Sequence, residues 1–346
     1  MTRRATAQDV ADLAGVSRSA VSLVLNGRAA GNISRVKQEA VRDAARQLRY
    51  TPNAVALSLR SKRTATLGVL TWPDRRQMPL ALLGAVYSEA SSAGYLLMMV
   101  DVLERPGQVD ALLDRRVDGF LVVAPELTEF VLPEPLTGVP AVLVNCFDPH
   151  LGASSLVPDE VAAGTSAAER LLESGHRSLG VLAGREGLAS ERRLQGVRRV
   201  AAAAGLPEPV VVRTGHTIED GYAGARELLE AELAPSGLVC THERLTLGAL
   251  LAAHDLGLAV PEDVSLVSLD DGEQLAAPLV PPVDLVVRPD GLIAAHALDL
   301  LVEQLELDLV ASPRQLSFAC PLKPGGSVAA PRQQALGRQV GQVGQA

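Results

Sequence analysis

The chain has 346 residues and a formal net charge of −8, and 47% of its residues are hydrophobic but only 3% are aromatic. This length exceeds one ordinary domain and allows a sizeable core, in which aliphatic side chains must do most of the packing. Three scattered cysteines argue against a disulfide framework, and the lack of a signal-peptide core or a long apolar run argues against secretion and membrane insertion, so a cytoplasmic protein is expected.

The charge is divided unevenly along the chain. Residues 1–63 carry 12 basic and 4 acidic side chains, a net charge of +8, whereas the remainder carries 20 basic and 36 acidic ones, a net charge of −16. Lysine and arginine gain free energy at a polyanion because they displace its condensed counterions. The asymmetry therefore predicts that the N-terminal end alone binds nucleic-acid phosphates.

The N-terminal residues predict short helices. The first is expected over 8–14 and ends at Gly15, which can adopt the positive φ of a helix end. Ser17 is a suitable N-cap for the second, over 18–25.

A third helix is expected from the cap Ser34 to about Leu48. Its buried stripe is predicted to contain Val36, Ala40, Val41, Ala44, Ala45 and Leu48. The pair Thr51-Pro52 indicates the start of a fourth helix over 52–61. Ten residues make only a marginal helix in water, so this segment is expected to fold only with a partner.

From Thr66 onward, short apolar runs alternate with helix-like stretches. Such alternation is typical of parallel sheets that helices cover on both faces. A break over 149–158 divides the runs into two sets, which predicts two doubly wound α/β lobes rather than one barrel. The expected strands are 67–70, 96–100, 120–123, 141–145, 179–183, 210–213, 238–240 and 265–269.

Four parts are expected along the chain. They are a helical headpiece over 1–51, a hinge helix over 52–63, a two-lobed body over 64–324 and a tail over 325–346. The tail is rich in Gly, Gln, Ala and Pro without periodicity, and it is expected to be disordered.

The stretch DVADLAGVSRSAVSLVLNG, residues 9–27, is the most specific motif. Small residues at Ala11 and Ala14 let two helices approach closely, and the helix after Ser17 presents polar side chains in its first turn. Such a helix fits the DNA major groove and offers these side chains to base edges. The alternative, an ordinary helical hairpin, gives no reason for the local charge of +8.

This motif resembles the DNA-binding segment of the lactose-repressor family of bacterial transcription regulators. The resemblance extends over about residues 6–324. It implies a helix-turn-helix headpiece, a body like the two-lobed periplasmic binding proteins, and a repressor whose DNA affinity responds to a small, sugar-like effector. Further matching segments, in chain order, are YTPN (50–53), LSLR (57–60), VDG (117–119), SGHR (174–177), RLQG (193–196), VPEDVS (260–265) and DD (270–271).

The resemblance places Arg18 and Ser19 at the base-reading start of the recognition helix. Arg18 can bond the O6 and N7 atoms of guanine, and the alternative is a phosphate contact only. Leu23 departs from the family, in which arginine is common there, so it either contacts a thymine methyl or packs internally. The expected DNA contacts are Ser17, Arg18, Ser19, Ser22, Leu23, Asn26, Asn53, Leu59 and Arg60.

Leu59 matches the apolar wedge that two hinge helices of the family insert together into the minor groove. The alternative is that Leu59 only joins the paired hinges, on one face with Val55. Either role requires a homodimer, which in turn implies a near-palindromic operator in double-stranded DNA.

Ligands of such sheets bind at the carboxyl ends of the strands. The expected effector contacts are Trp72, Asn145, Asp159, Arg193, His242 and Asp270. Trp72 could stack on a sugar face or simply pack. His242 and Glu243 stand where the family usually has Asn-Asp, so His242 could bond a ligand or be a surface histidine. Arg288 also replaces a commonly uncharged residue. With these departures, an effector pocket that has lost its function remains an alternative.

Other classes of protein fit less well. His242, Glu243, Asp270 and Asp271 lack any accompanying catalytic, metal or phosphate-loop motif, so we expect no enzyme, no cofactor and no metal. A periplasmic sugar receptor would share the two-lobed body, but this class does not account for the helical headpiece. A corepressor-dependent or effector-independent regulator stays as the alternative to an inducible repressor.

Overall fold

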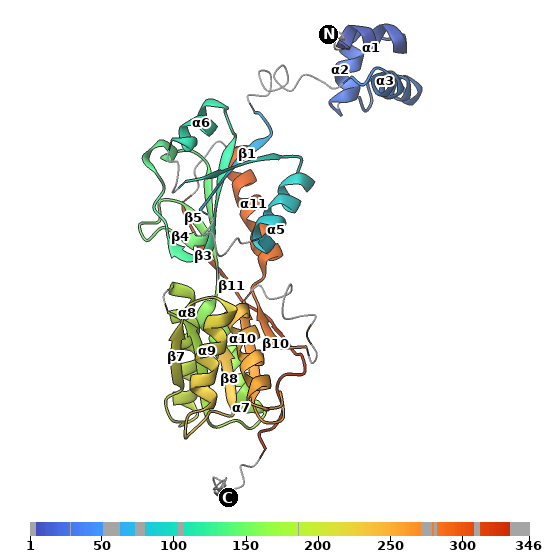
Figure 1. Ribbon diagram of the computed structural model, residues 1–346. Coiled ribbons are helices and arrows are strands. Elements are labelled where there is room, and N and C mark those ends of the chain that lie inside the picture. The colour runs from blue at the N-terminus through green and yellow to red at the C-terminus, as the bar shows by residue number, and fades with distance from the viewer. Residues whose placement is uncertain are drawn as a thin grey trace, which may run out of the picture. The chain divides into compact units, whose positions relative to one another are not determined.

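The computed structural model describes residues 5–27, 29–50, 63–72, 80–102, 107–185, 187–270, 279, 282–307 and 312–332 (Figure 1). The expected hinge helix over 52–61 lies outside these residues. They form two compact units, one of residues 1–66 with 115–118 and one of the rest of the chain, and each is described by itself. Among the described residues, no helix combines the length and apolar character needed to cross a membrane.

The headpiece contains α1 (Ala7–Ala14), α2 (Arg18–Leu25) and α3 (Arg35–Gln47). Gly15 ends α1 with a φ of 65°, as expected. The prediction of a buried Val36 was wrong, since this side chain is 76% exposed. Val36 lies in the first turn of α3, and the helix joins the core only from Val41 onward. That core contains Val10, Ala11, Val21, Val24, Ala29, Val41, Ala44 and Ala45.

The segment that leads from the headpiece toward the body is held by Asp118. One oxygen of this carboxylate accepts hydrogen bonds from the Thr64 backbone N–H (2.7 Å) and hydroxyl (3.0 Å). The other accepts from the Ala65 N–H (2.8 Å). Ala65 has a φ of 51°, so these bonds fix a backbone conformation that alanine seldom adopts.

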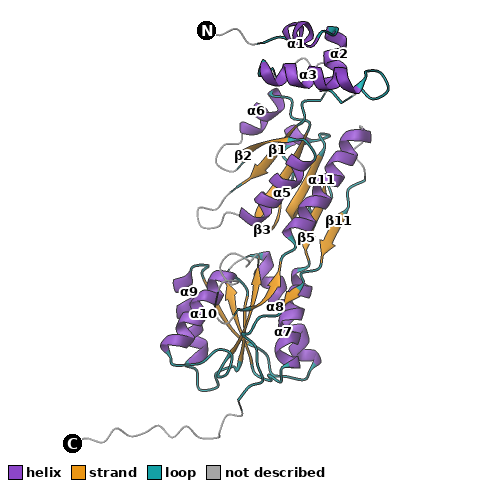
Figure 2. Cartoon of the chain, turned by 90° about the vertical axis from the view of Figure 1, so that its right-hand side faces the viewer, coloured by secondary structure: helices purple, strands orange, loops and turns teal. Residues whose placement is uncertain are grey.

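The N-lobe is a six-stranded sheet in the order β11-β5-β4-β3-β1-β2. Helices α5 and α11 cover one face, and α6 lies on the other, where Leu112 approaches Gly68 and Phe120 (Figure 2). The strands are β1 (Thr66–Thr71), β2 (Leu96–Asp101), β3 (Gly119–Glu129), β4 (Ala141–Phe147), β5 (Ser154–Pro158) and β11 (Gln315–Phe318), and the helices are α5 (Leu80–Ser92), α6 (Gln108–Asp114), the short 3-10 helix η1 (Glu134–Leu136) and α11 (Asp290–Leu307).

The C-lobe is a second six-stranded sheet, in the order β12-β10-β9-β8-β6-β7. Its strands are parallel except β12, which runs antiparallel to β10. Helices α7 and α8 cover one face, and α9 and α10 the other (Figure 2). The elements are α7 (Glu160–Glu173), β6 (Leu179–Gly184), α8 (Leu188–Ala203), β7 (Val210–Thr214), α9 (Ile218–Leu229), β8 (Gly237–Cys240), α10 (Glu243–Asp255), β9 (Ser265–Asp270), β10 (Asp284–Val287) and β12 (Leu322–Lys323).

These sheets confirm the predicted fold class and every strand expected from the apolar runs. The expected break over 149–158 was wrong in part, because β5 occupies its second half. The lobes are also not successive halves of the chain. It crosses from one sheet to the other between β5 and α7, between β10 and α11 and between β11 and β12.

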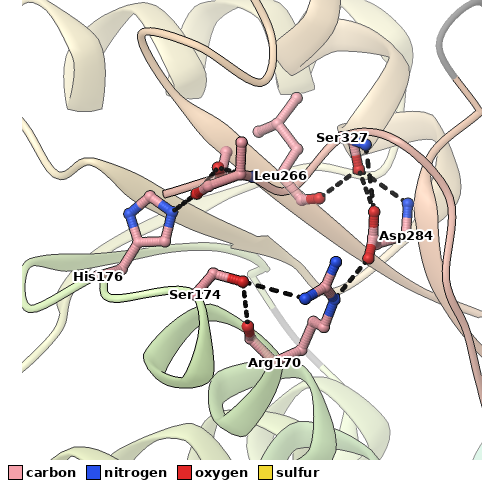
Figure 3. A network of polar contacts seen from close by, with 8 residues as sticks. Arg170, Ser174, His176, Leu266, Asp284 and Ser327 are labelled. Atoms are coloured by element: carbon pink, nitrogen blue, oxygen red, sulfur yellow. Dashed lines mark hydrogen bonds and ion pairs between the residues drawn. The ribbon is translucent and has the colours of Figure 1, made fainter. Parts of the chain in front are cut away.

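Residues 325–332, which were expected to begin a disordered tail, instead pack on the C-lobe. Ser327 is fully buried, and its N–H and hydroxyl both donate to the Asp284 carboxylate, at 3.1 and 3.3 Å. The second Asp284 oxygen accepts from Arg170 Nε at 2.7 Å (Figure 3). The His176 ring bonds the Ser236 hydroxyl and, through Nε2, the Ala329 carbonyl, both at 2.9 Å. These bonds supply an anchor that the composition of the segment does not reveal.

Removing the Asp284 charge is expected to destabilise the body. Asp284 is fully buried, so Asp284→Asn leaves the Arg170 guanidinium without its counter-charge and should lower the free energy of unfolding by about 3 kcal/mol, measured by urea denaturation. The control is Glu208→Gln, because the Glu208–Arg198 pair is 70% and 46% exposed and is worth at most about 1 kcal/mol. Equal losses in the two variants would contradict the anchoring role of Asp284.

Stability is expected to fall in mild acid through His176. Burial lowers the pKa of this imidazole from 6.5, outweighing the hydrogen bond to the Ala329 carbonyl. The unfolded chain then binds the proton more readily, so the contribution is complete above pH 6.5 and is lost as the pH falls below it. The unfolding midpoint should drop between pH 7.5 and 5.5, and less so in His176→Gln. The exposed-site control His150→Gln should keep the wild-type profile; an unchanged profile in His176→Gln would refute the assignment.

Candidate nucleic-acid interface and effector site

The recognition helix α2 begins with an exposed polar turn. Ser17 is its N-cap, and the Ser17 hydroxyl accepts a hydrogen bond from the Ala20 N–H (3.2 Å). Ser17, Arg18 and Ser19 are exposed, whereas Val21 and Val24 on the opposite side are buried in the headpiece core. The cap thus starts the helix where its first side chains point to solvent, an arrangement suited to reading a DNA groove.

The later expected DNA contacts on α2 are half-buried. Asn26 donates from Nδ2 to the Ser22 hydroxyl at 3.1 Å, so each of these side chains orients the other. Leu23 is half-buried, and among the described residues it does not belong to the headpiece core cluster. Asn53, Leu59 and Arg60 lie outside the described residues.

Three further arginines gather at the end of the headpiece, and the sequence reasoning did not single them out. Arg42, Arg46 and Arg49 line an open hollow of about 490 Å³ together with Leu25, Ala45 and Tyr50. All three arginines are exposed, and Arg46 also pairs with Asp43. Their spacing of four and three residues, which places side chains on one helix face, is the signal that could have found them.

The carboxyl ends of the two sheets meet within the body. Leu127 and Val157 of the N-lobe form one cluster with Ala189 of the C-lobe, and the Arg192 guanidinium lies 5.2 Å from the centre of the Phe147 ring. We call the carboxyl edge of the two sheets at this meeting point the effector edge; Trp72 directly follows β1, Asn145 lies in β4 and Asp270 ends β9. Its polar groups come from the ends of β1, β4, β8 and β9 and from the starts of α7 and α8.

On the N-lobe side, the Asn145 side chain is fixed by its amide nitrogen, and its amide oxygen remains available to a ligand. It is 1% exposed, has a φ of 58°, and donates from Nδ2 to the Ala124 carbonyl at 3.1 Å. Its Oδ1, and the hydroxyl of buried Thr71 at the end of β1, have no hydrogen-bond partner among the described residues. A buried polar atom without a partner is costly, so both are suited to bond a ligand. Trp72 stacks on Phe130 instead, with ring centres 4.8 Å apart.

On the C-lobe side, Arg193 is buried between two helices. Its Nε and Nη2 donate to the two oxygens of Glu160 at 2.5 and 2.9 Å, and its Nη1 donates to the Thr241 carbonyl at 2.5 Å. Asp159 is the N-cap of α7, and its Oδ1 accepts from the Ala162 N–H at 2.9 Å. Asp270 ends β9, and its side chain lies outside the description.

Two histidines lie edge to face at the C-lobe end of this edge. His242 is the N-cap of α10, where its Nδ1 accepts from the Arg244 N–H (3.1 Å), so it is not simply a surface histidine. The centre of its ring lies 5.7 Å from that of His216, whose buried Nδ1 has no partner among the described residues. The sequence reasoning missed His216. It directly follows β7, so the strand-end rule that selected the other residues could have found it.

Comparison with known proteins gives the same division of the chain. Residues 6–53 match the model of "Bacterial regulatory proteins, lacI family", and residues 168–328 match that of a periplasmic binding protein-like domain. The transcriptional repressor PurR of Vibrio parahaemolyticus is 30% identical over 312 residues, which is 87% of this chain and 92% of that one. The ribose operon repressor of Haemophilus influenzae is 28% identical, with the same coverage of both chains.

Solved structures are similar over nearly the whole length. The complex of the regulator CelR with cellobiose is 28% identical and superposes with a TM-score of 0.65, over 94% of this chain and 100% of that one. The lac repressor bound to ONPG is 25% identical, with a TM-score of 0.74 and the same coverage.

The headpiece and the two-lobed body thus define a DNA-binding transcription regulator with a small-molecule-binding fold. The chain belongs to the lacI family of bacterial regulatory proteins. The curated relatives named here are transcriptional repressors.

A methyl group at Gly164 is expected to disturb the effector edge. A Cβ there would clash with the Arg193 carbonyl oxygen, where α7 and α8 lie in close contact. Gly164→Ala should therefore lower the free energy of unfolding by about 1–3 kcal/mol, measured by urea denaturation. Gly291→Ala, with no atom within 4 Å of the new Cβ, should change it by at most about 0.5 kcal/mol. A neutral Gly164→Ala would show that the helices can separate freely.

Proposed function

We propose that this regulator is a repressor that binds a near-palindromic operator as a homodimer, and that a small effector at the effector edge sets its operator affinity. The observation that carries the proposal is the recognition helix, whose capped first turn exposes Arg18 and Ser19 on a unit with a net charge of +8 over residues 1–63. Since the operator lies on the chromosome, the cytoplasm is the proposed place of action.

The DNA contacts divide by role. Arg18 and Ser19 read base edges in the major groove, with Ser22, Leu23 and Asn26 farther along the helix. Ser17 caps the helix and, with Asn53 and Arg60, contacts the backbone, which positions the headpiece without reading sequence. Leu59 is proposed as the minor-groove wedge. The arginines at 42, 46 and 49 add positive charge beside the duplex.

An apolar face of the N-lobe supports the dimer. β2 is an edge strand of its sheet, and it and α5 expose Leu80, Tyr87, Leu96 and Met99 by 55–71%. Exposed apolar side chains at a sheet edge are a usual feature of interaction surfaces, and pairing about a two-fold axis gives two headpieces for two half-sites. The lac repressor, which shares this fold, was solved as a dimer bound to its operator.

The effector is proposed to be carbohydrate-like. Asn145 and Thr71 offer buried oxygens that a ligand hydroxyl could bond, and His216 offers a ring and a nitrogen without a partner among the described residues. Trp72, Asp159, Arg193, His242 and Asp270 are proposed to shape the site around them. Relatives are described with cellobiose and with ONPG. Such a ligand changes operator affinity only if it prefers one arrangement of the lobes.

Selection from a pool of random DNA duplexes by the purified full chain tests the proposal. The expected result is enrichment of a near-palindromic sequence, with enrichment altered by a sugar such as ribose or cellobiose. Absence of any preferred duplex at physiological salt, with and without sugars, would refute the regulator proposed here.

Two arginine variants separate base reading from phosphate binding. Arg18→Ala should lose about 1–3 kcal/mol for the selected duplex and relax the preference at one position of each half-site. Arg60→Ala should weaken binding to all duplexes alike and reduce its salt dependence. Fluorescence anisotropy with the selected and a random duplex measures both; equal losses of Arg18→Ala on the two duplexes would reassign Arg18 to phosphate.

A further inference from the structure

Two buried arginines at the effector edge, Arg193 and Arg288, each form an ion pair with a carboxylate. We infer that Glu160 is a specificity-determining residue, which occupies Arg193 and thereby makes the effector site select an uncharged ligand over an anionic one such as a sugar phosphate. This inference rests on the proposed function, because it takes the effector edge as the ligand site.

The Arg193–Glu160 pair leaves little positive charge available to an anionic ligand. The Arg193 and Glu160 side chains are 7% and 2% exposed, and two parallel hydrogen bonds join the guanidinium to the carboxylate. Bidentate arginine–carboxylate bonds are the geometry by which arginine binds carboxylates and phosphates. Glu160 therefore fills the place that an anionic group of a ligand would take, while the Thr241 carbonyl takes a third N–H.

A second pair repeats the arrangement. Arg288 donates from Nε and Nη2 to the two oxygens of Asp290 at 2.5 and 3.1 Å, and their side chains are 6% and 10% exposed. Both pairs lie near Cys320, between β11 and β12. The pKa of the Cys320 thiol is raised from 9.0 to about 12, mainly by burial; the charges of Glu160 and Asp159 also raise it, and those of Arg193 and Arg288 lower it. Two positive charges, those of Arg193 and Arg288, thus lie among three carboxylates, those of Asp159, Glu160 and Asp290.

The other polar groups at this edge point to the same class of ligand. Within the described part of the chain, the polar atoms here that lack a hydrogen-bond partner belong to the amide of Asn145, the hydroxyl of Thr71 and the imidazole of His216, all of them uncharged or weakly basic groups. Arg185, at the end of β6, is exposed, so water screens its charge. An incoming anion would meet the buried Glu160 carboxylate, and apposition of like charges strongly disfavours a wrong partner.

The expected behaviour is a gain of anion binding when the Glu160 charge is removed. Glu160→Gln leaves the Arg193 guanidinium buried without a counter-charge, which an inorganic anion can replace. In the full chain, phosphate at about ten times its dissociation constant should raise the Tm of this variant by about 3 °C over chloride of equal ionic strength. The wild type should show no phosphate-specific rise.

Matched variants exclude a general anion effect. Glu191→Gln removes an exposed carboxylate that also pairs with an arginine, Arg213, and should behave as wild type. The double variant Glu160→Gln/Arg193→Gln lacks both buried charges, so it should lose the phosphate response. If Glu160→Gln fails to fold in chloride, phosphate is expected to rescue its folding.

A phosphate-specific rise in the wild type would overturn the inference. So would a Glu160→Gln chain that phosphate neither stabilises nor rescues. Operator binding is measured separately on the wild type by anisotropy. Failure to bind any duplex would refute the proposed repressor but would leave the phosphate result in place, so the two failures are distinguishable.

Discussion

The body depends on the close contact of α7 with α8. Only glycine at 164 and 196 lets the two helices approach until backbone meets backbone, and this approach brings Glu160 of one helix to Arg193 of the other. The pair can be buried because its bidentate bonds and the Thr241 carbonyl satisfy the guanidinium. The same helices begin at the carboxyl edge of the sheet, so the packing constraint and the proposed ligand site share one place.

The two lobes are tied through the chain itself. Each crossing passes next to a polar side chain: half-buried Asp159 caps α7 after β5, the Arg288–Asp290 ion pair lies where β10 leads into α11, and the Cys320 thiol lies between β11 and β12. The proposed effector site therefore lies beside the segments that connect the lobes. A ligand bound there is proposed to act through these segments on the N-lobe, which follows directly on the headpiece in the chain.

The sequence predicted the parts of the fold that local patterns encode. Ser17 and Gly15 specify their helix ends by cap and φ, and continuous apolar runs specified the central strands. It did not predict β5, β10, β11 and β12, which are short; β5 opens with two serines, and the three apolar residues of β10 follow a buried aspartate. These segments form strands because they hydrogen-bond to neighbouring strands of the sheets.

The candidate site shows the same division. Arg18 and Asn145 were found because motif position and strand ends mark them in the chain. Glu160 as the partner of Arg193 was not, since 33 residues separate them and only helix packing joins them. Val36 was wrongly predicted to be buried, because helical periodicity does not show how far along the helix its packing partners extend.

The anchoring of Ser327 on Asp284 bears on the order of events during synthesis. The C-lobe sheet takes its last strand and its final buried hydroxyl from residues 322–327, which the ribosome makes near the end of translation. Chains grow from the N-terminus, so the headpiece can acquire its whole core while the sensor is still incomplete. A nascent chain therefore carries a finished DNA-binding module before it has the means to regulate it.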